Sequence, residues 1–125
     1  MTVLVDTSVL IDVLRGEDAA AAVLRDARAA GPLHTSEVTR LEVLAGMRDP
    51  EEAATRALLA VLTWHALDDK VAEVAGELGR RWLPSNRGID SADLAIAATA
   101  VILDARVLTR NIKHFPMFSG LSAPY

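Results

Sequence analysis

The sequence predicts an α/β fold in which a mainly parallel sheet is covered by helices on both faces. Short apolar runs alternate with helical patterns along the chain, and strands joined through helices run parallel with right-handed crossovers. The first run, Val3-Leu4-Val5, is apolar at every position, which is typical of a strand buried on both faces. The 125 residues contain no linker, repeat or low-complexity stretch, so we expect one domain over residues 1–125.

The first half of the chain is predicted to alternate strands with helices. In order, the elements are a strand over 3–5, a helix through 16, a helix over 17–30, a strand over 33–35 and a helix through 45. Gly31-Pro32 supplies the stop signal for the second helix. Ser36 can cap the third helix, because its side chain can accept a hydrogen bond from a free amide of the first turn.

The second half continues the same alternation. In order, the elements are a helix over 50–62, a strand over 64–67, a helix that begins at Asp68 or Asp69 and stops before Pro84, a helix from Asp90 through Leu103, and a strand over 107–109. Pro50 suits the first turn of a helix, where its missing N–H costs nothing. Both chain halves therefore supply strands that can join one sheet.

Composition restricts the kinds of site and partner. The net charge of −4 and pI near 5.3 argue against a protein that binds nucleic acid over its whole surface. There is no cysteine, so any metal must be held by oxygen or imidazole. No apolar run is long enough to span a bilayer, and the first residues lack the basic start of a secretion signal. We therefore expect a cytoplasmic protein without a membrane partner.

Two carboxylates stand out in the first half of the chain. Asp6 directly follows the first strand, and ligands of parallel α/β sheets bind beyond the carboxyl ends of the strands. An N-cap for the next helix is an equally good interpretation of Asp6. Glu42 lies within the apolar stripe predicted for its helix, which comprises Val38, Leu41, Leu44 and Ala45. One interpretation is that a cation or hydrogen-bond donors compensate the cost of burying the Glu42 charge. The other is that Glu42 lies at the border of the stripe, where it reaches solvent or pairs with an arginine.

Two further carboxylates lie at the start of the last predicted helix. Asp90 and Asp93 are three residues apart and form a capping-box pattern, and we interpret Asp90 as the cap. The residues after Asp93 are almost all apolar, so the helix and Asp93 are expected to be buried. Several carboxylates at one sheet edge repel one another, and a hard divalent cation such as Mg²⁺ or Mn²⁺ is the usual compensation. Such sites perform phosphoryl chemistry.

Four segments together resemble the successive motifs of VapC-type PIN domains. They are Val-Leu-Val-Asp-Thr-Ser at 3–8, Thr-Ser-Glu-Val-Thr-Arg-Leu-Glu at 35–42, Gly-Ile-Asp-Ser-Ala-Asp-Leu-Ala-Ile-Ala-Ala-Thr-Ala at 88–100, and Val-Leu-Thr-Arg-Asn-Ile-Lys-His-Phe at 107–115. The resemblance covers essentially the whole chain. It implies a three-layer α/β/α fold, Mg²⁺-dependent endoribonuclease activity, and inhibition by a small cognate VapB-type antitoxin.

The resemblance also implies roles for individual residues. Asp6, Glu42 and Asp93 match the three core acids of the family, expected to be catalytic and to bind metal. Thr7 is expected to support Asp6 by hydrogen bonding, and Thr109 and Asn111 to support the ligands in the same way. Asn111 stands where many PIN domains have a fourth acid. Asp90 could supply that missing charge as a further ligand.

The implied substrate is structured RNA, of the tRNA or rRNA class, cut to leave a 3′-hydroxyl and a 5′-phosphate. Candidates for contact with its backbone are the basic residues Arg15, Arg87, Arg110 and Lys113. The three histidines, His34, His65 and His114, match no site of the family. His114 is expected to be a surface residue, with contact to phosphate as the alternative. We also expect a homodimer, with 10–14 and 41–44 as candidate interface stretches.

Two other functions fit parts of the sequence. A PIN-like binding module without catalysis would have no reason to keep three mutually repelling acids. A phosphoacceptor or aspartate-nucleophile phosphatase needs an activating lysine near the end of a later strand, and Lys113 is misplaced for that role. Position 8 is serine, whereas the phosphatase motif has a second aspartate two residues after the first.

Overall fold

The computed structural model describes residues 1–125 and contains one four-stranded sheet with the strand order β3-β2-β1-β4. The strands are β1 (Val3–Val5), β2 (Leu33–Ser36), β3 (Thr63–His65) and β4 (Arg106–Leu108). Every neighbouring pair is parallel, and Val5 lies opposite Leu108 in the pairing of β1 with β4. The predicted parallel α/β fold is confirmed.

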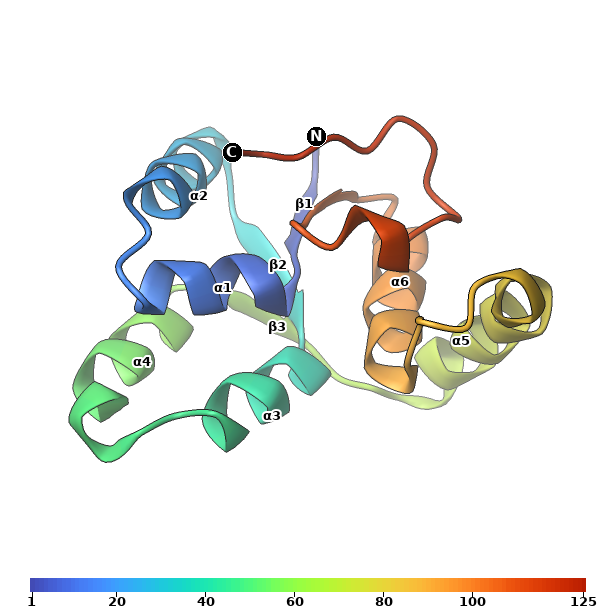
Figure 1. The fold of residues 1–125 in the computed structure, drawn as a ribbon, viewed down its shortest axis with the longest axis horizontal. Coiled ribbons are helices and arrows are strands. Elements are labelled where there is room, and N and C mark those ends of the chain that lie inside the picture. Colours follow the sequence, from blue (N-terminus) through green and yellow to red (C-terminus); the bar gives the residue numbers. More distant parts are fainter.

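Helices connect the strands and form a layer on each side of the sheet (Figure 1). They are α1 (Thr7–Leu14), α2 (Asp18–Ala30), α3 (Glu37–Ala45), α4 (Glu52–Leu59), α5 (Asp69–Trp82) and α6 (Ser91–Leu103). Three short 3₁₀ helices complete the chain: η1 (Asp49–Glu51), η2 (Leu83–Ser85) and η3 (Ile112–His114). The arrangement is the expected three-layer α/β/α architecture.

Two separate cores hold the layers together. On one face, Val3 and Val5 of the central strand pack with apolar residues that include Leu24 of α2 and Leu59 of α4. On the other face, Leu4 packs with residues that include Ile96 of α6. Alternate residues of β1 thus point into different cores, and a strand covered on both sides must be apolar throughout. Helix α6 is central to the second core, because its residues from 93 to 100 are all buried.

The order of the strands determines where polar groups meet. The chain builds β1, β2 and β3 outward in one direction and then returns to place β4 on the opposite side of β1. The point between β1 and β4 is therefore a topological switch point, the usual position of a ligand site in open α/β sheets. The amide of Asp6 donates a 2.9 Å hydrogen bond to the Leu108 carbonyl, so both strand ends lie side by side there.

The predicted helix starts are largely confirmed. Ser36 caps α3 by accepting from the Val38 amide at 3.2 Å, and Asp68 caps α5 by accepting from the Val71 amide at 2.9 Å. Asp90 caps α6 and accepts from the Asp93 amide at 2.9 Å. Each cap satisfies an amide that the first turn leaves without a helical partner.

Some predicted boundaries and surfaces were wrong. Strand β3 spans 63–65 rather than 64–67, because it pairs with β2 and ends beside Ser36, where β2 gives way to α3. Helix α4 ends at Leu59 rather than at 62, and the Leu59 carbonyl accepts from the Trp64 indole at 3.0 Å. The stripe of α3 that faces the core contains Thr39 and Val43, whereas Leu41 is 66% exposed. Within the proposed 10–14 interface stretch, Leu10 is fully buried in the chain's own core.

No helix in the structure has the length and apolar character needed to cross a membrane.

Candidate active site at the carboxyl end of the sheet

Asp6 occupies the switch point and is held there by three hydrogen bonds to one of its oxygens, donated by two residues. Its Oδ2 accepts hydrogen bonds from the Ser8 hydroxyl and the Thr109 hydroxyl, each at 2.7 Å, and from the Ser8 amide at 3.4 Å. The residue is only 3% exposed. Asp6 also caps α1, so the capping and functional interpretations are both compatible with its position.

The second oxygen of Asp6 is free of hydrogen bonds. No buried side-chain oxygen or nitrogen in the structure lacks a hydrogen-bond partner. Because Oδ1 of Asp6 has none, it must reach solvent. The carboxylate therefore presents one fixed oxygen inward and one open oxygen toward the edge of the sheet, as a residue that binds a ligand requires.

Glu42 lies on α3, and its side chain accepts a hydrogen bond from one hydroxyl group rather than from an arginine. The Thr7 hydroxyl donates to Oε1 of Glu42 at 2.6 Å, and Thr7 Oγ1 lies 3.0 Å from Thr39 Oγ1. The prediction that Thr7 supports Asp6 is therefore wrong: its side chain contacts Glu42. The reason is that Asp6 and Thr7 are consecutive at a helix start, so their side chains project in different directions. Oε2 of Glu42 makes no hydrogen bond and remains open.

Asp93 lies in the first turn of α6 and is buried as expected, with 8% exposure. Its Oδ2 accepts from the Asp90 amide at 3.1 Å, which completes a capping box. Nδ1 of His114 lies 3.1 Å from the same oxygen. Burial raises the pKa of the Asp93 carboxyl to about 6; the Asp90 amide lowers it, the Asp90 carboxylate raises it, and nearby His114 lowers it.

The three acids share one edge of the sheet, but each has its own set of partners. No three carboxylates or imidazoles lie close enough together to hold one metal ion. The donor atoms nevertheless fit a hard divalent cation in kind, because Asp6, Glu42 and Asp93 each retain a carboxylate oxygen without a hydrogen bond. The structure thus fixes the directions of the carboxylates and leaves their outer oxygens available.

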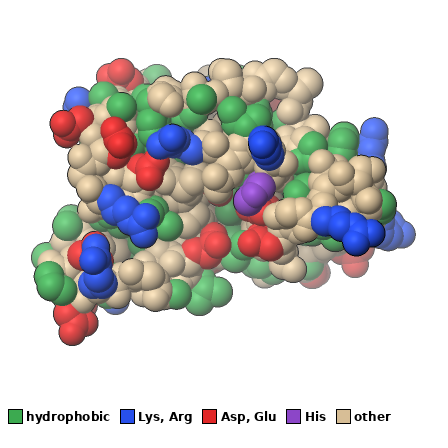
Figure 2. All heavy atoms as spheres, viewed as in Figure 1, with side chains coloured by type: hydrophobic (Ala, Val, Ile, Leu, Met, Phe, Trp, Pro, Cys, Tyr) green, Lys and Arg blue, Asp and Glu red, His purple; other side chains and the backbone are tan.

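Basic residues lie around this acidic centre. Figure 2 shows acidic side chains gathered in the middle of one face, next to a histidine, with Lys and Arg side chains on either side. Arg110 and Lys113 lie on the segment after β4, and both are exposed. Arg15 lines a pocket of about 460 Å³ together with Glu42 and Arg48. Arg87 instead lines a groove of about 770 Å³ between α5 and α6, so the structure does not place it with the other three.

The structure adds two residues that sequence reasoning did not include in the site. Ser8 donates to Asp6 and accepts from the Arg110 amide at 3.1 Å; its place two residues after an N-cap aspartate was an available signal. His114 was expected at the surface but contacts Asp93, and no local pattern links two residues on separate elements. Asn111 acts through its main chain, because its amide donates to Thr109 Oγ1 at 2.9 Å.

Comparison with known proteins gives consistent results. The PIN domain family model matches residues 3–117. Ribonuclease VapC19 of Mycobacterium tuberculosis is 45% identical over 123 residues, which cover 98% of each chain. Ribonuclease VapC10 of the same organism is 41% identical over 123 residues, covering 98% of this chain and 92% of the relative. A toxin-antitoxin complex from Klebsiella pneumoniae contains a chain with a TM-score of 0.79 and 28% identity, covering 99% of this chain and 98% of that one.

Proposed function

This chain belongs to the VapC family of PIN domains, and on that premise we propose that it is a metal-dependent endoribonuclease that acts as the toxin of a toxin-antitoxin pair. One observation carries the proposal. The carboxylate of Asp6 is fixed at the switch point of the sheet by Ser8 and Thr109, yet keeps one oxygen open to solvent. A buried acid held in this way at a ligand-binding edge is suited to chemistry rather than to capping alone.

The proposed cofactor is Mg²⁺, with Mn²⁺ as a substitute, held by Asp6, Glu42 and Asp93, and Asp90 as an additional candidate. Oxygen ligands suit both ions, and the chain offers no thiolate. When bound, such a cation offsets the charge of the scissile phosphate and acidifies water at the site. Asp93 would then favour its ionised form, because a nearby cation lowers the pKa that burial has raised.

The residues around the acids keep them in place for this role. Ser8 and Thr109 fix Asp6, and Thr7 fixes Glu42, each by donating a hydroxyl hydrogen. Loss of a hydrogen bond that orients a metal ligand typically lowers metal affinity or activity by about 10- to 100-fold. The substrate supplies a phosphodiester, and hydrolysis leaves a 3′-hydroxyl and a 5′-phosphate.

We assign structured RNA of the tRNA or rRNA class as substrate. Arg110 and Lys113, on the segment after β4, and Arg15, beside Glu42, are the basic side chains best placed to contact its backbone. Arg87 is a weaker candidate because it lies at the groove between α5 and α6. A few basic side chains beside the acidic centre allow RNA to bind locally, although the net charge of the chain is −4.

The proposed partner is a small VapB-type antitoxin. Support comes from the relatives, since the structural neighbour from Klebsiella pneumoniae is described as a toxin-antitoxin complex. An antitoxin arginine could enter the acidic centre and replace the cation there, because a guanidinium forms paired hydrogen bonds with carboxylates. A homodimer in the cytoplasm remains part of the proposal.

The test uses the purified protein with bulk tRNA and rRNA, followed by sequencing of the RNA ends. We expect cleavage in Mg²⁺ that stops with chelator and is lost in Asp6→Asn. Asp26→Asn removes an exposed carboxylate of α2 and is the matched control, which should cleave like the parent. Expression in cells should slow growth unless the neighbouring antitoxin gene is expressed as well. Harmless expression of soluble protein, or equal cleavage by Asp6→Asn, would overturn the proposal. Calorimetry that detects no Mg²⁺ binding would favour an inactive binding module.

A further inference from the structure

Three residues from distant parts of the sequence meet on the outer side of α1. Oδ2 of Asp12 accepts from the Tyr125 hydroxyl at 2.7 Å and from Nη1 of Arg110 at 3.1 Å. The guanidinium carbon of Arg110 lies 4.9 Å from the centroid of the Tyr125 ring, within the range of a cation–π contact. Arg110 thus donates to a carboxylate and lies over the face of an aromatic ring.

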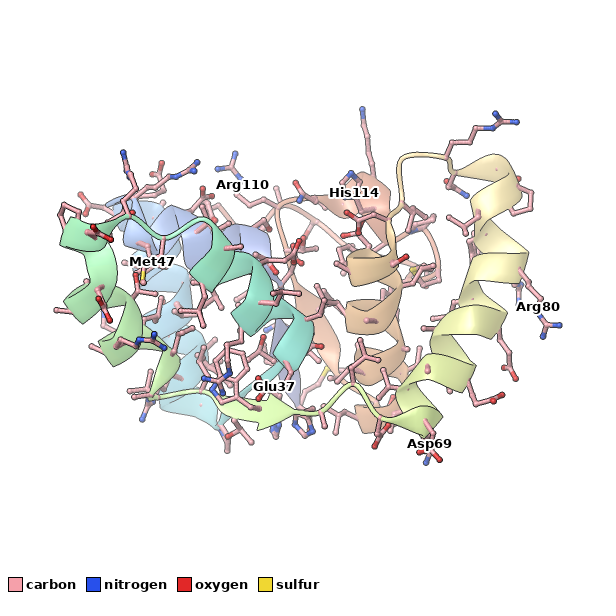
Figure 3. The ribbon with its side chains drawn as sticks, turned by 90° about the horizontal axis from the view of Figure 1, so that it is seen from below. Glu37, Met47, Asp69, Arg80, Arg110 and His114 are labelled. Carbon is pink, nitrogen blue, oxygen red and sulfur yellow. The ribbon has the colours of Figure 1, made fainter.

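This cluster is joined to the acidic centre through the main chain. The Arg110 amide donates to Ser8 Oγ at 3.1 Å, and the Ser8 hydroxyl donates to Asp6 Oδ2 at 2.7 Å. Thr109, the residue before Arg110, also donates to Asp6. The backbone of Arg110 is therefore fixed beside Asp6, and only its side-chain torsions are left to be set. Figure 3 shows Arg110 at the same edge of the molecule as His114, the histidine that contacts Asp93.

Stability alone is a poor explanation for the cluster. The Arg110 side chain is 46% exposed, and exposed ion pairs contribute little to the free energy of folding. Asp12 is more sheltered, with a side-chain exposure of 27%, and Tyr125 packs against the core that contains Val3 and Val5. Burial and the hydrogen bond to Asp12 raise the pKa of Tyr125, so its hydroxyl remains a donor. Asp12 and Tyr125 are therefore fixed in place, whereas the Arg110 guanidinium that they contact is open to solvent and to a substrate.

We propose that Asp12 and Tyr125 are positioning residues that hold the Arg110 guanidinium for contact with an RNA phosphate beside the acidic centre; this inference rests on the proposed ribonuclease function. A guanidinium carries five N–H groups in a planar fork. Asp12 occupies Nη1 only, and the remaining edge can form the paired hydrogen bonds that phosphate accepts. Holding the side chain in advance removes rotamer entropy that binding would otherwise lose.

The proposal and its alternative predict changes of KM in opposite directions for the substitution Asp12→Asn. Asp12 carries a negative charge at the rim of a site for a polyanion, so a carboxylate without a positioning role repels RNA. If Asp12 has no positioning role, Asp12→Asn removes this repulsion and lowers KM. If Asp12 holds Arg110 away from the substrate, Asp12→Asn also lowers KM. If Asp12 positions Arg110, the same substitution raises KM even though it removes a repulsive charge. Long-range electrostatics therefore cannot produce the expected result.

The experiment measures kcat and KM for cleavage of a fluorescein-labelled RNA hairpin in Mg²⁺. We expect Arg110→Gln to raise KM by about tenfold, and Asp12→Asn to raise it by about fivefold with kcat nearly unchanged. Tyr125→Phe keeps the ring and loses only the hydroxyl, so a rise of about threefold is expected. The charge-matched control is Glu73→Gln, which removes an exposed carboxylate on α5. This variant should have the KM of the parent or a slightly lower one.

A double variant separates positioning from structural damage. In the Arg110→Gln background the guanidinium is absent, so Asp12→Asn should now lower KM, because only the repulsion by Asp12 is left to remove. Arg110→Gln should also reduce the slope of log kcat/KM against log salt by about 0.7, the loss of one phosphate contact. Melting curves identify variants that fail to fold. If Asp12→Asn fails to fold, Tyr125→Phe still tests the positioning role.

The outcomes distinguish this inference from the function on which it rests. If the parent protein cuts no RNA in Mg²⁺, the ribonuclease proposal fails. If the parent cuts RNA but Asp12→Asn lowers KM, or Asp12→Asn has the same effect with and without Arg110, the positioning role is overturned. A loss of kcat with unchanged KM in Asp12→Asn would also overturn it, because that result places the defect in the acidic centre.

Discussion

The Thr109 hydroxyl donates a 2.7 Å hydrogen bond to Oδ2 of Asp6, and this contact joins the residues that follow β4 and β1 at the switch point of the sheet. The two residues are 103 positions apart in the sequence, and both are almost completely buried. Because the bond occupies Oδ2, it leaves Oδ1 as the oxygen that faces solvent. The orientation of the central carboxylate thus depends on the correct placement of a strand from the other end of the chain.

Replacing Thr109 by valine tests this contact. The change keeps the side-chain shape and removes the hydroxyl that donates to Asp6, so we expect RNA cleavage to fall about ten- to a hundredfold. Stability should decrease by about 1.5 kcal/mol, as for the loss of a hydrogen bond to a charged group. Thr99→Val is the matched control, because its hydroxyl is equally buried but donates to the Ala95 carbonyl within α6. Equal cleavage by the two variants would show that the orientation of Asp6 does not matter.

Asp93→Asn separates a metal ligand from a helix cap. Asparagine keeps an oxygen that can accept from the Asp90 amide, and it removes a charge whose burial raises the carboxyl pKa to about 6. In chelator at neutral pH we therefore expect the variant to melt at or above the temperature of the parent. With Mg²⁺ the parent should gain stability by mass action and the variant less, while cleavage falls by orders of magnitude.

The control for that experiment is Asp68→Asn, the same change at the cap of α5, outside the acidic centre. Mg²⁺ should raise the melting temperature of Asp68→Asn as much as that of the parent, and this variant should cut RNA normally. Melting curves of all three proteins, with chelator and with Mg²⁺, give the comparison. An Asp93→Asn protein that melts lower in chelator, responds fully to Mg²⁺ and still cuts RNA would mean that Asp93 is only a cap.

The paired histidines of β2 and β3 predict a pH-dependent stability. His34 Nδ1 lies 2.8 Å from His65 Nε2, and burial together with the neighbouring His34 lowers the pKa of His65. Below the ordinary value of about 6.5, the unfolded chain then binds more protons at this position than the folded one. The free energy of unfolding should therefore decrease as the pH falls through and below that value.

His65→Gln removes this contribution, so its melting temperature should depend less on pH between neutral and mildly acidic conditions than that of the parent. His34→Gln leaves His65 half-buried but removes its imidazole neighbour, so its stability should depend on pH to an intermediate degree. Thermal melts of the three proteins across this pH range, all in chelator, provide the measurement. Parallel curves for the parent and His65→Gln would contradict the lowered pKa.

Leu41 provides a test of self-association. It is the most exposed large apolar residue after Met1, at 66%, and it belongs to the predicted interface stretch 41–44. We expect the parent to sediment as a dimer at micromolar concentration and Leu41→Glu to sediment as a monomer, since an apolar contact cannot accept an unpaired charge. Val101→Glu, at a position 47% exposed on α6, is the control. A monomeric parent would exclude the homodimer.

The sequence by itself determined the features that depend on neighbouring residues. Strand β1 could be predicted because all of Val3–Val5 is apolar, and the caps Ser36 and Asp90 could be predicted because a cap acts on amides two or three residues away. The burial of Asp93 followed from the apolar residues after it. Four motifs in order indicated the family, and with it the three candidate acids.

Tertiary structure alone decided which side chains meet. Thr7 contacts Glu42 rather than Asp6, and the exposure of Leu41 follows from the way α3 turns Thr39 and Val43 toward the core. The end of β3 depends on its register with β2. Asp12 and Tyr125 are 113 residues apart, and Arg110 joins them only because β4 returns to lie beside β1. Periodicity reports which face of an element is apolar, whereas these contacts are set by register and packing between segments that are distant in the sequence.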